Sequence, residues 1–144
     1  MRKAFYLCAC LALVFAACKT PRAAVSLSSL EGEWNIVTLN GAQLSQEANK
    51  PYLRFDAADR RLSGNAGCNL ISGEIAYKEV KKNALKFQKV ISTRRACLDM
   101  GREDELLKTL DKVTRFEAET PQRITFYSAD NQKLFVLERR ADTN

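Results

Sequence analysis

The chain has 144 residues, of which 46% are hydrophobic and 28% are charged, the mixture of an ordinary globular protein with one domain. It contains no histidine, which removes the commonest general base and metal ligand and every Ser-His or Cys-His nucleophile pair. The formal charge of +6 is spread along the chain instead of forming a basic face with aromatic residues, so nucleic acid is not an expected partner. We therefore expect a protein that is not an enzyme and has no metal or cofactor.

Residues 1–17 have the pattern of a secretory signal peptide. Arg2 and Lys3 form a short positive segment, and the 14 residues of 4–17 that follow carry no charge. The apolar part of a signal peptide is about 7–15 residues long, whereas a transmembrane helix needs about 20. The sequence therefore predicts a leader that is removed on export.

Residues 15–18 (FAAC) resemble a lipobox, the bacterial signal for attaching diacylglycerol to a cysteine and cleaving before it. Phe15 departs from the pattern, because Leu, Val or Ile is usual there. The match predicts a lipid anchor on Cys18, with residues 18–29 as a tether that binds the protein to a membrane. Cleavage by an ordinary signal peptidase, or an uncleaved leader, are the alternatives.

The residue after Cys18 indicates which membrane holds the anchor. Lys19 stands where an Asp often retains lipoproteins at an inner membrane. By that resemblance we expect a location in the cell envelope, at the outer membrane, on its periplasmic or its surface face. Several acyl chains on one cysteine hold a protein stably, whereas a single chain holds it only marginally.

Strand-like runs recur at short spacing after residue 30, and no internal repeat is visible. They combine β-branched and aromatic residues with alternating polarity and end at turn residues such as Asn40-Gly41. The predicted strands are 33–39, 51–55, 71–77, 84–91, 123–127 and 133–137. These runs predict a mainly β (α+β) fold: an antiparallel, β-barrel-like sheet with one amphipathic helix.

The helix is predicted over residues 102–113. Leu106, Leu110 and Val113 recur on one face, and Leu107 widens that apolar stripe. The acidic run 103–105 falls in the first turn, where the helix dipole favours negative charge, so we expect it to serve the helix instead of acid–base chemistry.

The run 64–69 (GNAGCN) is the densest loop signal of the chain. Its backbone N–H groups could form an anion-binding nest, but it lacks the Gly-Lys-Ser/Thr ending of a phosphate loop. We favour a structural loop in which Gly64 and Gly67 allow positive φ and the side chains of Asn65 and Asn69 bond to the backbone.

Two cysteines remain if Cys18 takes a lipid and the leader, with Cys8 and Cys10, is removed: Cys68 and Cys97. Export would place this pair in an oxidising compartment, where disulfides persist, so we favour a structural disulfide. A redox-active pair and two free thiols are the alternatives. The neighbouring arginines 94 and 95 could lower the pKa of a Cys97 thiol, but no C-x-x-C spacing supports redox chemistry.

Four short motifs spread over the chain form a distinctive set. They are Leu30-x-Gly32-x-Trp34 with Asn40-Gly41; Ser63 to Asn69 with Ser72-Gly73; Thr93 to Cys97; and Glu105-Leu106-Leu107 with Leu110. Together they resemble the META domain family, the group of the HslJ-like heat-inducible lipoproteins, over a domain at 30–140. One departure is Arg95, where a Met is common.

The resemblance implies a compact antiparallel barrel-like fold with a single helix, and a Cys68–Cys97 pair. It implies loose associations with stress tolerance, motility, secretion and virulence, and it carries no catalytic residues. We therefore expect a non-enzymatic envelope lipoprotein that acts as an interaction or stress-protective module for an unidentified envelope protein or the secretion machinery.

Trp34 lies in a Gly-x-Trp motif that also occurs in lipocalin-like barrels. We favour Trp34 as a core aromatic residue that closes one end of the sheet. The alternative function is that of a carrier, whose barrel would enclose a small apolar ligand or a lipid chain.

Overall fold

The computed structural model describes residues 25–45, 50–78, 80, 83–97 and 100–141. The predicted signal peptide, the lipidation site at Cys18 and most of the predicted tether lie outside this described part. No helix in the described part has the length and apolar character that crossing a bilayer would require.

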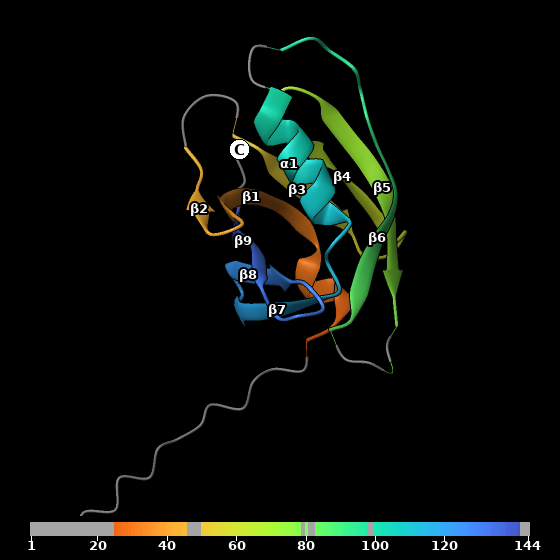
Figure 1. Cartoon of the computed structure of the whole chain (residues 1–144). Helices are drawn as coiled ribbons and strands as arrows, with labels where there is room; N and C mark the ends of the chain where they lie inside the picture. Colours follow the sequence, from red (N-terminus) through yellow and green to blue (C-terminus); the bar gives the residue numbers. More distant parts are fainter. Residues whose placement is uncertain (1–24, 46–49, 79, 81–82, 98–99, 142–144) are drawn as a thin grey trace, which may run out of the picture.

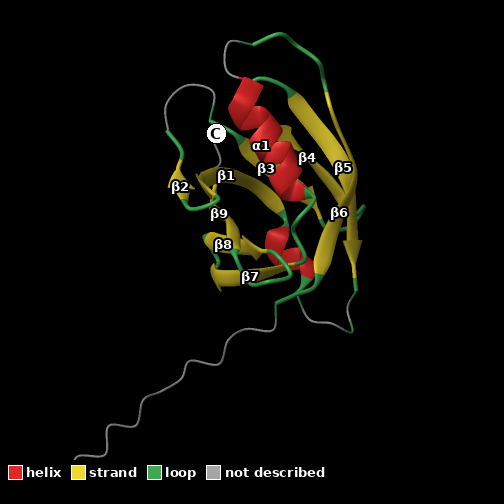
Figure 2. Ribbon diagram, viewed as in Figure 1, coloured by secondary structure: helices red, strands yellow, loops and turns green. Residues whose placement is uncertain are grey.

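Nine strands of the described part form one strongly curled antiparallel sheet, a half-barrel, and one α-helix accompanies it (Figures 1 and 2). The mainly β fold with a single helix is therefore confirmed. The elements are η1 (Leu27–Leu30), β1 (Gly32–Leu39), β2 (Ala42–Gln43), β3 (Tyr52–Asp56), β4 (Arg61–Asn65), β5 (Leu70–Tyr77), β6 (Leu85–Ser92), α1 (Met100–Leu110), β7 (Arg115–Thr120), β8 (Arg123–Tyr127) and β9 (Lys133–Arg139).

The strand order across the sheet is β6-β5-β4-β3-β1-β9-β8-β7, and the short β2 pairs with β1. Its two edge strands, β6 and β7, meet at a single antiparallel bridge between Ala84 and Arg115. Hydrogen bonds on either side, from Leu85 N–H to the Thr114 carbonyl (3.1 Å) and from Phe116 N–H to the Asn83 carbonyl (3.0 Å), extend this contact. The curl is thus closed at one point.

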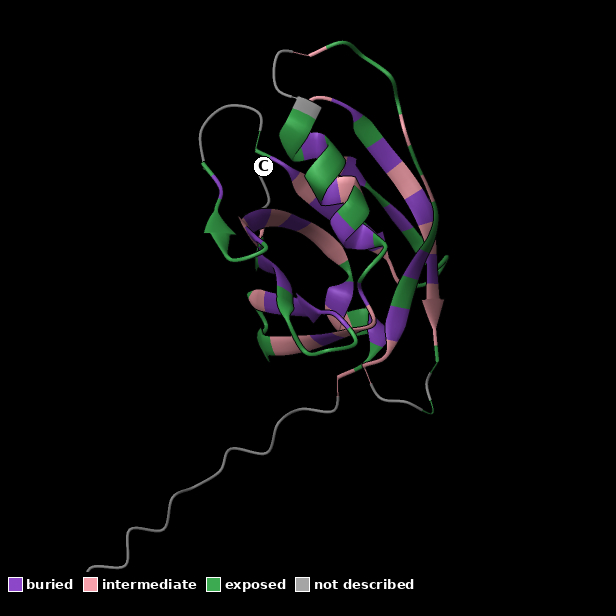
Figure 3. Cartoon of the chain, in the orientation of Figure 1, coloured by how far each residue is buried: buried purple, intermediate pink, exposed green. Residues whose placement is uncertain are grey.

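The interior of the half-barrel is packed with aromatic rings. Phe126 of β8 lies at the centre of four others, with ring centroids 5.6 to 6.5 Å from its own. The surrounding rings are those of Phe55, Phe87, Phe116 and Phe135. Buried and exposed residues alternate along β4 and the first half of β6, as expected for a sheet with one face in the core (Figure 3).

Trp34 of β1 is fully buried in the core of the domain. Its indole Nε1–H donates to the carbonyl of Leu30 at 2.7 Å, and the guanidinium carbon of Arg139 lies 4.3 Å from its ring centroid. Leu30 belongs to the 3₁₀ turn η1, whose Leu27 is also buried in the core. Packed structure therefore begins before residue 30, inside the segment that the sequence assigned to the tether.

Helix α1 spans Met100–Leu110, against a prediction of 102–113. Leu106 and Leu110 are fully buried in the same core as the sheet, and Leu107 packs at its margin. Val113 is also buried but lies beyond the helix, in a turn where its N–H bonds to the Leu110 carbonyl. The apolar stripe was therefore predicted correctly, but its last residue, Val113, lies in the turn between α1 and β7.

Candidate functional site

The predicted structural loop 64–69 includes the last two residues of β4, and residues 66–69 connect β4 to β5; two glycines shape this segment. A side chain on Gly64 would collide with the backbone carbonyl of Tyr52 on β3. Gly67 has a φ of +122°, a conformation that residues with a Cβ rarely adopt. The Asn65 side chain accepts a hydrogen bond from Gly67 N–H at 2.6 Å, a local Asx-type bond.

Three N–H groups of this segment are occupied by the chain itself. Ala66 N–H bonds to the Asn69 carbonyl at 2.9 Å, Gly67 N–H to Asn65, and Asn69 N–H to the carboxylate of Glu103 at 3.0 Å. These three donors are therefore not directed at an external ligand. The arrangement supports the structural interpretation of the loop over an anion-binding nest.

Buried Asn69 is the centre of a polar network, which we call the clamp: Asn69, Ser92, Thr93, Arg95 and Glu103. The Asn69 side chain is completely buried. Its amide oxygen accepts from the Thr93 hydroxyl at 2.8 Å and from Arg95 N–H at 2.7 Å. Its amide nitrogen donates to the Glu103 carboxylate at 2.8 Å and to the Arg95 carbonyl at 3.3 Å. All of these bonds join segments distant in the sequence.

Glu103 brings a carboxylate from the first turn of α1 into this network. The residue is only 3% exposed, and its two oxygens accept from Asn69 N–H, from the Asn69 amide and from the Ser92 hydroxyl (3.3 Å). The sequence assigned Glu103 to the helix dipole; the structure adds the larger role of joining α1 to the β4–β5 loop. A buried carboxylate needs such donors, because an unpaired charge in the interior costs several kcal/mol.

Cys68 and Cys97 lie beside the clamp, in sequence next to Asn69 and two residues after Arg95. Their Cα atoms are 6.4 Å apart, within the range that a disulfide spans, and the structure pairs their sulfur atoms. This Cα distance is compatible with the structural disulfide favoured from the sequence. The backbone of both segments is already fixed by the hydrogen bonds of Asn69.

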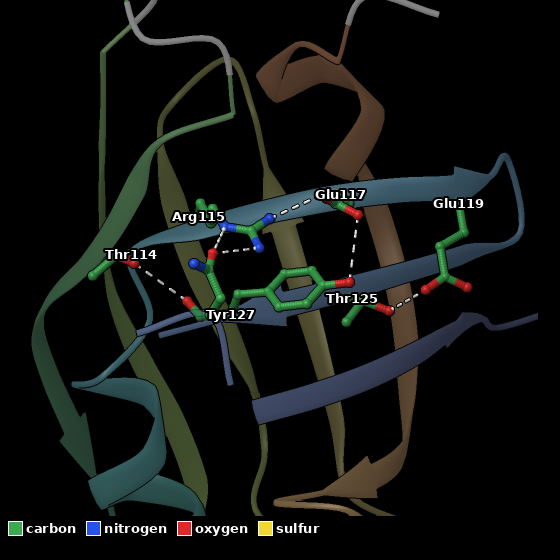
Figure 4. A network of polar contacts seen from close by, with 7 residues as sticks. Thr114, Arg115, Glu117, Glu119, Thr125 and Tyr127 are labelled. Atoms are coloured by element: carbon green, nitrogen blue, oxygen red, sulfur yellow. Dashed lines mark hydrogen bonds and ion pairs between the residues drawn. The ribbon is translucent and has the colours of Figure 1, made fainter. Parts of the chain in front are cut away.

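A second polar network covers the outer face of β7 and β8 (Figure 4). The Arg115 guanidinium lies over the Tyr127 ring, 3.9 Å from its centroid, and pairs with the Glu117 carboxylate at 2.9 Å. Tyr127 Oη–H donates to Glu117 at 3.4 Å, and the Thr125 hydroxyl donates to Glu119 at 2.7 Å. Nothing in the sequence analysis identified this network, since it depends on pairing β7 with β8.

Burial raises the pKa of Tyr127 above its ordinary value, and the nearby carboxylates of Glu117 and Glu119 raise it further. The phenol therefore stays protonated at neutral pH and acts as a hydrogen-bond donor to Glu117. Each of the carboxylates is already bonded to a neighbouring side chain, so the network serves to cover the buried Tyr127 and Thr125. Across the described residues, no group of three or more acidic or cysteine side chains is arranged to hold a metal.

The curled half-barrel, the single helix and the clamp around the GNAGCN loop define one class of small β domain. The family model of the META domain matches residues 26–141, and the chain belongs to the META domain family. The resemblance inferred from the motifs is therefore confirmed. In sequence, no protein of curated function matches the chain.

Solved structures share the fold. One, determined by NMR and described as a protein from Burkholderia xenovorans, is 22% identical, with a TM-score of 0.60 over 80% of this chain and 86% of that one. A second NMR structure is 20% identical, with a TM-score of 0.63 over 83% of this chain and 99% of that one. A DUF4847 family protein from Bacteroides vulgatus is 9% identical, with a TM-score of 0.57 over 78% and 94% of the two chains. At these identities the likeness concerns the fold alone.

Replacing Asn69 with Ala should lower the free energy of unfolding by about 2–4 kcal/mol, because it leaves the buried Glu103 carboxylate without its amide donor. Chemical denaturation measures the loss, and Asp104→Ala, an exposed neighbour of Glu103, is the matched control. In a double-mutant cycle with Glu103→Ala, the two losses should be strongly non-additive. Simple additivity would show that the two residues act independently.

The mature, unreduced protein should show no free thiol when unfolded, because Cys68 and Cys97 are expected to be joined. Titration with a thiol reagent in denaturant tests this directly, and two reactive thiols would refute the disulfide. Replacing both cysteines with Ser should lower the free energy of unfolding, by about 3.6 kcal/mol in the chain-entropy model for a loop of roughly 30 residues.

Because the pKa of Tyr127 is raised in the folded protein, the free energy of unfolding should decrease as pH rises in the alkaline range. Below the unfolded-state value near 10 the contribution is complete, and it is lost as pH rises from there through the folded-state pKa, because only the unfolded state then releases its proton. Tyr127→Phe should remove this part of the alkaline loss, at most about 1.4 kcal/mol per pH unit. Chemical denaturation at several pH values between 8 and 11 measures this decrease, with Tyr77→Phe as control. The same pH dependence of the free energy of unfolding in wild type and in Tyr127→Phe would contradict the prediction.

Proposed function

We propose that this protein is a lipid-anchored, non-catalytic protein of the bacterial cell envelope, whose META domain is a rigid module for contact with another envelope component. The leader pattern of residues 1–17 and the lipobox-like residues 15–18 support the anchor. The paired cysteines beside the clamp are consistent with an oxidising compartment.

One observation carries the choice of an interaction module over a carrier: the centre of the half-barrel is occupied by the Phe126 ring and the four rings around it. In a carrier, that space would be reserved for the ligand. Trp34, whose Gly-x-Trp motif also occurs in lipocalin-like barrels, is fully buried and bonded to η1. Binding is therefore assigned to the outer surface of the domain.

A non-catalytic role is supported by the chemistry of the two polar networks. In the clamp, the amide of Asn69 and the carboxylate of Glu103 are saturated by each other and by backbone groups. In the outer network, Tyr127 is held as a neutral donor to Glu117. Neither network places a general base next to a free nucleophilic side chain, the arrangement that nucleophilic catalysis by an activated Ser, Thr or Cys requires.

The lipid anchor is tested by replacing Cys18 with Ala in the full chain and fractionating cells. The wild type should sediment with membranes, and the variant should move to the soluble envelope fraction or stay unprocessed, because the acyl chains that bind the bilayer are gone. Intact-mass analysis of the wild type should show the added lipid. The double variant Cys8→Ala with Cys10→Ala, inside the leader, is the control and should behave as wild type. Unchanged membrane association of the Cys18 variant would contradict lipidation.

A further inference from the structure

Exposed apolar side chains gather at one place on the described surface. Three large hydrophobic residues of the described part are exposed, and two of them lie together: Leu70 on β5 is 53% exposed and Ile91 on β6 is 67% exposed. In the ladder, Ile91 is paired with Ser72, which stands two residues from Leu70 and on the same side of the sheet. Leu70 and Ile91 are thus diagonal neighbours on the outer face.

Two arginines extend this apolar pair. Arg94 and Arg95 follow β6 after Thr93, and both are exposed. No carboxylate of the described residues forms an ion pair with either of them. We call Leu70, Ile91, Arg94 and Arg95 the apical patch. It combines apolar contact area with positive charge that forms no ion pair with the carboxylates of the described residues, the composition that acidic protein segments complement.

The clamp positions the backbone of two residues of the apical patch, Leu70 and Arg95. Leu70 follows Asn69 directly, its N–H bonds to the Thr93 hydroxyl at 3.1 Å, and the Thr93 N–H bonds back to the Leu70 carbonyl at 3.0 Å. Arg95 is anchored through its backbone to Asn69, so its side chain is left to the surface. A surface ordered in advance loses little conformational entropy on binding.

The edge of β6 is poorly suited to pairing with an added strand. Lys89 has a φ of +50°, and the register with β5 shifts beside it, the geometry of a β-bulge. Its ammonium pairs with Glu74 at 3.0 Å. Bulges and lysines on an edge strand discourage edge-to-edge pairing, so a partner is expected to contact the side chains of the patch and not to extend the sheet.

The position of the patch in the fold favours a protein partner over the lipid bilayer. The N-terminal end of the described chain, which leads toward the proposed anchor, emerges at the lower end of the domain, whereas the segment after β6 lies at the upper end (Figure 1). A domain held by its N-terminus therefore presents the patch away from the bilayer that holds it.

We propose that the apical patch is the docking surface for an acidic segment of another envelope protein, an inference that rests on the proposed function. The apolar side chains of Leu70 and Ile91 would supply the contact area, and the two guanidinium groups would pair with carboxylates of the partner.

The test uses the full chain in intact cells, with a photo-crosslinking amino acid at position 91. We expect a specific protein adduct whose crosslinked peptide, identified by mass spectrometry, is acidic. The same crosslinker at Gln122, an exposed residue between β7 and β8, should give no such adduct. Adducts with lipid alone, no adduct at position 91, or an adduct with a segment that is not acidic would each overturn the proposal.

Charge reversal provides the second arm. Arg94→Glu with Arg95→Glu should reduce the adduct on the order of tenfold, without lowering the thermal stability, because the clamp uses only the backbone of Arg95. The control, Lys112→Glu with Lys133→Glu, makes the same change in net charge at two exposed residues and should leave the adduct unchanged. Equal yields in both double variants would overturn the proposal.

Fractionation of the same cells distinguishes failure of the lipid anchor from failure of the docking surface. A soluble protein that still crosslinks refutes only the anchor, and an anchored protein without the adduct refutes only the patch.

Discussion

The buried carboxylate of Glu103 is the constraint on which this end of the domain depends. Taking a charge out of water is costly, and the cost is offset only where several well-placed donors surround it. Here Asn69 supplies two of those donors, one from its backbone and one from its side chain, and Ser92 supplies a third. Moving either the helix or the loop would leave the carboxylate unsatisfied, so the position of α1 and the path of the β4–β5 loop determine each other.

The cysteine pair and the clamp act on the same two segments by different physical means. Hydrogen bonds to Asn69 favour the folded state directly, whereas in the chain-entropy model a disulfide acts mainly by restricting the unfolded chain. Because Asn69 neighbours Cys68, and Arg95 stands two residues before Cys97, the network that forms without any covalent bond already holds the two cysteines at bridging distance. Pairing of the cysteines would then reinforce a geometry that the polar contacts define.

The fold could be predicted from the sequence wherever the local pattern of apolar and polar residues indicated a strand or a helix. Alternation located β1, β3, β5, β6, β8 and β9, and the stripe of Leu106 and Leu110 located the helix. Strand β7 was not predicted, because its sequence RFEAET has a single fully buried residue, Phe116, and its acidic side chains resemble those of a surface loop. Its conformation comes from pairing with β8, a tertiary interaction that no local pattern reports.

In the candidate site, too, local contacts could be predicted from the sequence and long-range contacts could not. The glycines and Asn65 could be assigned to a tight loop because their partners lie within a few residues, as with Asn65 and Gly67. The central role of Asn69 could not be foreseen, since its partners Thr93, Arg95 and Glu103 are 24 to 34 residues away. An acidic residue in the first turn of a helix has a sufficient local explanation in the dipole, and that explanation concealed the buried contact of Glu103.

The residues that close the clamp also determine what the surface above it presents. In a β-strand, successive side chains point to opposite faces, so a strand whose Ile71 packs in the core must direct Leu70 outward. Arg95 reaches the interior only through its backbone, which leaves its guanidinium to the solvent. The polar network that joins the β4–β5 loop to helix α1 therefore also positions Leu70 and Arg95 on the outside of the domain. With aromatic rings packed at its centre, the half-barrel leaves its outer surface for contacts with other molecules.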